Sequence, residues 1–171
     1  LWIGTNDLGW KAFLSDSQVP GASLSTYVDC IWDVYDGIYE TGGRNFVLLK
    51  VIPLELIPLY AGPELRGTGD SRYWNNKTAY NMTEYQNKMF EYTTSVNTMF
   101  DYGAGYNLIV EERWPGANVT VFDVYQFFSD IYHNPDDYLT APANVTGHYE
   151  VCSVDGSECG YSEEPRDSFL W

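Results

Sequence analysis

The sequence opens with Leu1-Trp2-Ile3-Gly4-Thr5-Asn6-Asp7. Apolar residues followed by a glycine and short polar residues are typical of a strand that ends in a polar turn, which we expect to reach Gly9. In an open α/β sheet, ligands bind at the carboxyl ends of the strands. The end of this first strand is therefore where the sequence first predicts a functional site.

Downstream of this turn, residues 24–40 predict a helix. Apolar side chains recur there at helical spacing, Ser23 or Ser25 can cap the start, and two glycines at 42–43 follow the end. Cys30 falls within this pattern, so we expect a buried free thiol unless its partner lies outside this sequence. The predicted inward face consists of Leu24, Tyr27, Val28, Ile31, Tyr35, Ile38 and Tyr39.

Two short apolar runs predict strands. Residues 45–52 form a nearly continuous apolar run before Pro53, which is typical of a buried parallel strand. Residues 119–122 predict a second strand, and Asp123 is expected to cap a helix that ends at Asn134-Pro135. The inward face of this helix is predicted to consist of Val124, Tyr125, Phe128, Ile131 and Tyr132.

A further helix is predicted between the two strands, from about Thr83 to about Arg113. The segment 106–110 has the composition of a strand, but Trp114-Pro115-Gly116 is a natural helix stop, which favours a helix that continues through a glycine-rich weak point at 103–105. Strands that alternate with helices indicate an α/β layered fold with a mainly parallel sheet.

Composition limits the possible partners. The chain has 171 residues, a formal net charge of −15 and 17% aromatic residues, which indicates one globular domain with a sizeable core. A strongly acidic chain lacks the basic patch that nucleic acids and anionic membranes require. No apolar run is long enough to span a bilayer. The sequence also begins without Met, so a signal peptide would lie outside it.

Sequons and cysteines predict a secreted, extracellular protein. Cys152 and Cys159 lie in a polar, glycine-bearing stretch that suits a hairpin disulfide in an oxidising compartment, although two free thiols remain the alternative. The number of Asn-x-Ser/Thr sequons exceeds the chance expectation from composition. The predicted glycosylation sites are Asn76, Asn81, Asn118 and Asn144.

Gly4, Asn6 and Asp7 are candidates for an oxyanion site. A glycine leaves space for a substrate carbonyl, and an asparagine amide can donate a hydrogen bond to the negative charge that develops on it. The alternative for these residues is an Asx-type turn that only ends the strand.

The order of the motifs resembles the SGNH/GDSL hydrolases, and among them the fungal secreted carbohydrate esterases that act as acetylesterases. The resemblance covers nearly the whole chain. The motifs that carry it are Trp2-Ile3-Gly4-Thr5-Asn6-Asp7, Val47 to Pro53 with Leu54 and Pro58, Trp114-Pro115-Gly116-Ala117, Val121-Phe122-Asp123-Val124-Tyr125 and Asn134-Pro135-Asp136-Asp137-Tyr138.

This resemblance implies a three-layer α/β/α, flavodoxin-like SGNH hydrolase fold and a Ser-His-Asp acyl-transfer mechanism without a cofactor. It assigns Asn6 as an oxyanion-hole side chain, with Gly4 and Asp7 as its setting. The family's N-terminal Gly-Asp-Ser block and C-terminal Asp-x-x-His block have no match in their expected places. We therefore expect residues 1–171 to be one SGNH domain that is incomplete at both ends, inactive alone and aggregation-prone along the unpaired edge at residues 1–4.

Other residue groups are weaker candidates. Gly69-Asp70-Ser71 spells the nucleophile triplet, but it follows the Asn6 motif and no apolar strand leads into it, so a loop turn is expected. His133 and His148 lack the neighbours of a metal site or a catalytic base. The adjacent acidic pairs of the chain fit solvated surface better than glycosidase carboxylates.

The sequence thus favours part of a secreted serine esterase that removes acetyl or short acyl groups from plant cell-wall carbohydrate. Two alternatives stay open. A GDSL-type lipase or phospholipase would share the fold, and a non-catalytic carbohydrate-binding glycoprotein would share the scaffold without the triad.

Overall fold

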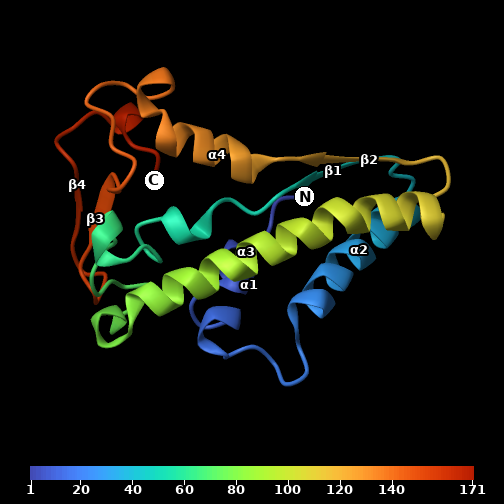
Figure 1. The fold of residues 1–171 in the computed structure, drawn as a ribbon, viewed down its shortest axis with the longest axis horizontal. Helices are drawn as coiled ribbons and strands as arrows, with labels where there is room; N and C mark the ends of the chain where they lie inside the picture. Colours follow the sequence, from blue (N-terminus) through green and yellow to red (C-terminus); the bar gives the residue numbers. More distant parts are fainter. The chain divides into compact units, whose positions relative to one another are not determined.

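The computed structural model describes residues 1–171, except for the side chain of Val151. These residues form two compact units, whose elements are labelled in Figure 1. The first unit comprises Leu1–Ile52 and Glu91–Val124, and the second comprises Pro53–Phe90 and Tyr125–Trp171. The chain mixes helices with a small parallel sheet, as the α/β prediction requires. The single domain stays a prediction.

The parallel sheet lies in the first unit. Strands β1 (Asn45–Leu49) and β2 (Asn118–Phe122) pair in parallel, with Asn45 opposite Asn118. The N-terminal segment adds a single parallel bridge between Trp2 and Leu49. The expected polar turn after it is one helical turn, α1 (Thr5–Leu8), because Leu8 is fully buried and draws the backbone inward.

β1 is the predicted parallel strand, but it is buried on one face only. Phe46 and Leu48 are buried, whereas Val47 between them is 49% exposed. Successive side chains of a strand point to opposite faces, and an apolar composition alone does not place a covering layer over the second face.

Helix α2 (Leu24–Glu40) starts at a capping box in which the Ser23 and Thr26 side chains bond reciprocally to each other's backbone. Its buried residues are Val28, Ile31, Trp32 and Tyr35. Two predictions for this helix are wrong, because Cys30 is exposed and Ile38 is 41% exposed. Trp32 is buried in their place, which rotates the inward face away from Cys30.

Helix α3 (Met82–Gly105) continues into a π-helical turn at Tyr106–Val110. The preference for helix over strand in this segment is therefore confirmed. Asn107 stabilises the turn, since its Nδ2 donates to the Gly103 carbonyl at 2.8 Å. None of the helices in the described part of the chain is both long and apolar enough to cross a membrane.

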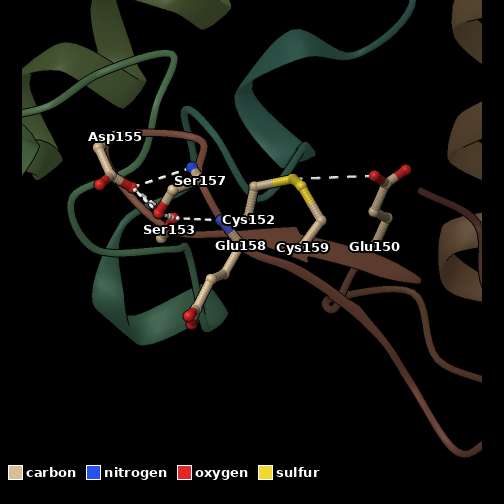
Figure 2. Close-up of a disulfide and its surroundings, with 7 residues drawn as sticks. All are labelled: Glu150, Cys152, Ser153, Asp155, Ser157, Glu158 and Cys159. Atoms are coloured by element: carbon tan, nitrogen blue, oxygen red, sulfur yellow. Dashed lines mark hydrogen bonds between the residues drawn. A yellow bond between two sulfur atoms is a disulfide. The ribbon is translucent and has the colours of Figure 1, made fainter.

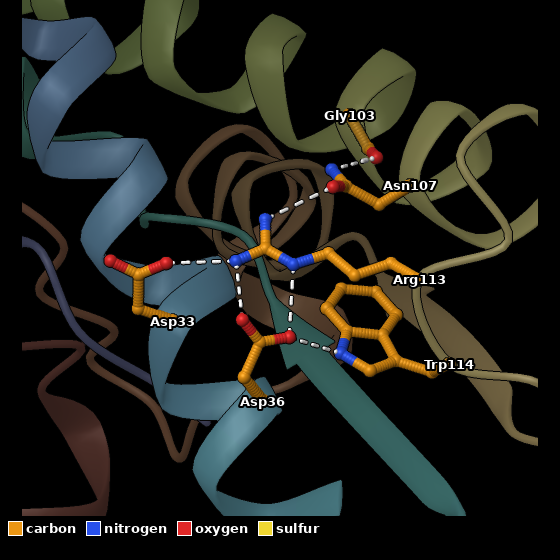
Figure 3. A network of polar contacts seen from close by, with 6 residues as sticks. All are labelled: Asp33, Asp36, Gly103, Asn107, Arg113 and Trp114. Carbon is orange, nitrogen blue, oxygen red and sulfur yellow. Dashed lines mark hydrogen bonds and ion pairs between the residues drawn. The ribbon is translucent and has the colours of Figure 1, made fainter.

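Arg113 connects the end of this helical stretch to α2 (Figure 3). Its Nε and Nη2 bind both Asp36 oxygens, at 2.9 and 2.6 Å, and Nη2 also contacts Asp33 at 2.8 Å. The Trp114 indole donates to Asp36 at 2.8 Å. The hydrogen bond from Arg113 is the main reason that the pKa of Asp36 lies below its usual value. This network fixes Trp114, which packs at 6.2 Å from Trp32 and 5.8 Å from Tyr35 between ring centroids.

Replacement of Arg113 by Ala is expected to lower the free energy of unfolding of the whole protein by about 1–2 kcal/mol, a value discounted for the partial exposure of the pair. Arg113→Lys restores less than half of this, because an ammonium cannot bind both oxygens of Asp36 in a fork. Urea unfolding measures both effects. Arg72→Ala, at an exposed arginine, is the control, and an equal loss in that variant would contradict the role of the network.

The second unit contains helix α4 (Val124–His133) from Tyr125 onward and the antiparallel pair β3 (Glu150–Cys152) and β4 (Cys159–Tyr161). Val124 and Ile131 of α4 are buried, as predicted. The structure contains the Cys152–Cys159 disulfide that the spacing predicts (Figure 2).

Buried Lys77 donates from Nζ to the carbonyls of Pro58 and Ala61, and burial lowers its pKa to about 8.

Glu55 is a buried carboxyl in the second unit. Its Oε1 accepts a 2.6 Å hydrogen bond from the Tyr125 hydroxyl, and its Oε2 is buried without a partner among the described groups. Burial raises its pKa, and the bond from Tyr125 opposes this shift only in part. The fold therefore favours the neutral acid at this position.

A raised pKa in the folded state gives stability that is complete below the unfolded pKa of about 4.5 and is lost as the pH rises through the folded pKa. Glu55→Gln keeps the acceptor for Tyr125 and removes the ionisation. We expect the melting temperature of the variant, relative to that of the native protein, to rise by about 2–4 °C as the pH is raised from 4.5 to 8. Calorimetry across this range measures the difference, and a constant difference would contradict the assignment.

Candidate active site

The residues that follow the parallel segments of the first unit form the candidate site. Gly4 and Asn6 follow the segment that bridges to β1, Lys50 and Val51 follow β1, and Asp123 follows β2. The carboxyl ends of parallel strands meet at one edge of a sheet. The residues predicted as an oxyanion site therefore lie at the edge where an α/β sheet binds its ligands.

Gly4 occupies a backbone conformation that only glycine adopts readily, with φ 132° and ψ −28°. A Cβ at this position would lie 2.7 Å from Val51 Cγ2 and 3.2 Å from the Tyr27 hydroxyl. Conformation and space both require a glycine here. The sequence identified this residue because a glycine beside an asparagine leaves room for a substrate carbonyl.

Asn97 holds the residue against which Gly4 packs. Its side chain lies in the first unit, accepts from the Val51 N–H at 2.8 Å and donates to the Val51 carbonyl at 2.9 Å. Asn97 is 7% exposed, so both bonds are shielded from water. Sequence reasoning missed this residue, although an asparagine between Val96 and Phe100 on a predicted helix is a signal for a buried polar contact.

Asn6 is the second residue of α1 and is exposed, whereas Asp7 is partly buried. The turn is closed by the Leu8 N–H, which donates to the Gly4 carbonyl at 2.9 Å. Burial raises the pKa of the neighbouring Tyr27, and the charge of Asp7 adds to this effect. Asn6 is thus presented to solvent on a short, anchored turn, where a substrate can reach it. Its role as an oxyanion donor stays a prediction.

Lys50 is a second residue of this edge that the sequence did not reveal. Its Nζ lies 2.7 Å from Asp101 and 2.8 Å from Asp123, and its side chain is 13% exposed. Burial acts to lower the pKa of Lys50, but the two carboxylates outweigh burial and raise it. Asp123, predicted as a helix cap, therefore also joins β2 to the residue that follows β1.

The triplet Gly69-Asp70-Ser71, which spells the nucleophile motif, forms a loop turn, as expected. Asp70 accepts hydrogen bonds from the backbone and hydroxyl of Thr78, at 2.8 and 2.9 Å. Ser71 Oγ accepts from the Trp74 N–H at 3.2 Å, so its hydroxyl is used within the turn. His133 is exposed at the end of α4. None of these residues belongs to the part of the chain that carries Asn6.

One group of potential metal ligands occurs among the described side chains, formed by Glu150, Cys152 and Cys159. The disulfide takes both sulfurs, as Figure 2 shows, so this group offers no thiolate. Nearby, the carboxylate of Asp155 accepts three hydrogen bonds from Ser153 and Ser157, which lower its pKa to about 2. These contacts close the hairpin loop and are structural.

The four sequon asparagines differ in accessibility. Asn76, Asn81 and Asn118 are exposed. Asn118 also donates to the Asn45 side chain at 3.1 Å, across the start of the parallel pair. Asn144 is half-buried, and its Oδ1 accepts from the Gly147 N–H at 2.8 Å. Glycosylation at each of these positions stays a prediction.

No protein-family model matches the chain, but the chain is similar to a curated protein. This protein, from Hypocrea jecorina, is named acetylesterase and is 51% identical over 171 residues. The match covers 100% of this chain and 49% of that protein, so the chain spans about half the length of the curated relative it matches. The resemblance to acetylesterases is confirmed, and the SGNH group and mechanism stay predictions.

Proposed function

We propose that the whole protein to which this chain belongs is a carboxylic ester hydrolase that releases acetate from acetyl esters. The observation that carries this proposal is the 51% identity to an acetylesterase over all 171 residues. The placement of Gly4 and Asn6 at the carboxyl edge of a parallel sheet supports it, because this edge is where α/β enzymes bind ligands.

In the proposed mechanism, this chain supplies the oxyanion side of the site. A serine outside residues 1–171 attacks the ester carbonyl, and a histidine, also outside them, accepts its proton and then gives it to the departing alcohol. Asn6 donates from its amide to the oxyanion of the tetrahedral intermediate, and Gly4, packed against Val51 and Tyr27, holds the turn that carries Asn6. Water then hydrolyses the acetyl-serine by the same steps and releases acetate.

The proposed fold of the whole protein is the three-layer SGNH type, and its proposed location is extracellular. The exposed face of β1 and β2 supports further layers in the whole protein, since parallel sheets are buried on both faces. The sequons and the Cys152–Cys159 disulfide support secretion. The proposed substrate is acetylated plant cell-wall carbohydrate, and the high aromatic content of the chain is compatible with aromatic side chains that stack on sugars.

Hydrolysis of 4-nitrophenyl esters by the whole purified protein tests this function. We expect kcat/KM to be highest for the acetate and to fall steadily with acyl length, because Val51 and Tyr27 already fill the space beside Gly4. A preference for octanoate or longer esters would favour the lipase alternative. Absence of turnover for every ester would contradict the proposal and favour a non-catalytic protein.

A further inference from the structure

A pocket of about 680 Å³ lies in the second unit, close to the C-terminal residues. This volume is within the range of about 300–1,000 Å³ that is usual for small-ligand sites. The lining side chains that matter here come from two segments, around 144–148 and 161–169, and are Asn144, His148, Tyr161, Glu163, Glu164 and Phe169.

The walls of the pocket are fixed by backbone bonds between these segments. Asn144 forms an isolated parallel bridge with Phe169, in which its N–H donates to the Ser168 carbonyl at 2.7 Å and its carbonyl accepts from Leu170 at 3.2 Å. The Ser162 N–H donates to the Tyr149 carbonyl at 2.9 Å. Backbone hydrogen bonds from both the N–H and the carbonyl of Asn144 therefore fix its position in the pocket wall.

The chemistry of the lining combines aromatic faces with hydrogen-bonding groups. The ring of Tyr161 is 65% exposed and lies 5.4 Å from the ring of Tyr149, which packs 5.8 Å from Phe169. His148 Nδ1 is buried and has no hydrogen-bond partner among the described groups. Burial lowers the pKa of His148, so its neutral ring presents an acceptor or a donor according to its tautomer. Two carboxylates at Glu163 and Glu164 disfavour an anion.

Such a lining suits a neutral ligand with hydroxyl and amide groups and one apolar face, as a sugar has. Asn144 lies in this lining and begins the sequon Asn144-Val145-Thr146. The other sequon asparagines are exposed instead. A sugar attached to Asn144 would be placed at the pocket by its covalent bond to the protein.

We propose that this pocket holds the first N-acetylglucosamine of an N-linked glycan on Asn144. One face of the sugar ring packs on Tyr161, and its hydroxyl and N-acetyl N–H groups donate to the carboxylates of Glu163 and Glu164. The glycan thereby joins the disulfide hairpin to the segment around Asn144. This inference does not rest on ester hydrolysis and holds for an active or an inactive protein.

The test uses the whole protein secreted from a fungal host, with mass spectrometry of the peptide that contains Asn144. We expect N-acetylglucosamine on Asn144. Thr146→Ala removes the sequon without changing Asn144, and it is expected to lower the melting temperature by about 2–4 °C. Thr146→Ser keeps the sequon and is expected to leave the melting temperature unchanged. Thr83→Ala, which removes the exposed Asn81 sequon, is the matched control and is also expected to have no effect.

A double-mutant comparison separates sugar packing from other effects of these substitutions. Tyr161→Ala is expected to lower the melting temperature more in the glycosylated protein than in Thr146→Ala, because the contact with Tyr149 is lost in both backgrounds and the contact with the sugar only in the first. Tyr73→Ala, at a second tyrosine that is 65% exposed, is expected to act equally in both backgrounds. An endoglycosidase that leaves only the first sugar is expected to preserve the melting temperature. An unmodified Asn144, or an equal effect of Tyr161→Ala in both backgrounds, would overturn the proposal.

Discussion

Asn6→Ala in the whole protein is expected to lower kcat for an acetate ester by about 10²–10³-fold, which corresponds to about 2.7–4 kcal/mol of transition-state stabilisation. The amide of Asn6 is exposed on α1, a turn that the Leu8–Gly4 hydrogen bond closes. Because the amide meets a charge that exists only after attack on the carbonyl, its loss is expected to change kcat much more than KM.

The control for this experiment is Thr5→Ala, since Thr5 precedes Asn6 in the same turn and is also exposed. We expect this variant to keep kcat within a few-fold of the native value. Asn6→Asp places an acid where an oxyanion forms and is expected to be at least as inactive as Asn6→Ala. A kcat for Asn6→Ala within threefold of the native value would remove Asn6 from the mechanism and leave it as a turn residue.

Gly4→Ala is expected to lower the free energy of unfolding of the whole protein by about 2–5 kcal/mol, the combined cost of a strained backbone and an overfilled contact. The added Cβ would lie 2.7 Å from Val51 Cγ2. Val51 cannot retreat easily, because Asn97 binds both its backbone N–H and its carbonyl. Activity is expected to fall as well, since any relief of the clash moves the turn that carries Asn6.

Gly21→Ala is the matched control for Gly4→Ala, because Gly21 also has a positive φ, 88°, but nothing lies within 4 Å of the Cβ that alanine would add. This variant is expected to lose about 1–2 kcal/mol from backbone strain alone. Denaturant unfolding of the two variants isolates the cost of the contact with Val51. Equal losses would show that this contact contributes nothing.

The main elements of the fold could be predicted because their patterns are local. Helices α2 and α4, the strands β1 and β2 and their parallel pairing follow from apolar spacing and from residues that stop helices. Most errors concern which face of an element is buried, although the turn expected after Gly4 is the helical turn α1. Ile38 and Cys30 of α2 are exposed and Trp32 is buried because tertiary packing, which the spacing does not contain, chooses the inward stripe.

The candidate site could be predicted only where a single short segment carries it. Gly4 and Asn6 are close in sequence, so the local pattern Gly-x-Asn-Asp is enough to predict their role. Asn97 acts on Val51 across 46 residues, and Lys50 meets Asp123 across 73. These contacts depend on which segments end at the same edge of the sheet. The same limit applies to Asn144. Its sequon can be read from three consecutive residues, whereas its pocket is formed together with residues that lie further along the chain.

The Lys50 ion pairs have a consequence for product release. The ammonium of Lys50 is held by Asp101 and Asp123, so the three groups together carry one negative charge. In the proposed mechanism, an acetate ion formed beside this edge would meet this net negative cluster, and the formal charge of −15 on residues 1–171 would also repel it. The sheet edge would thereby favour departure of the anion over its retention, and weak inhibition by accumulated acetate is expected.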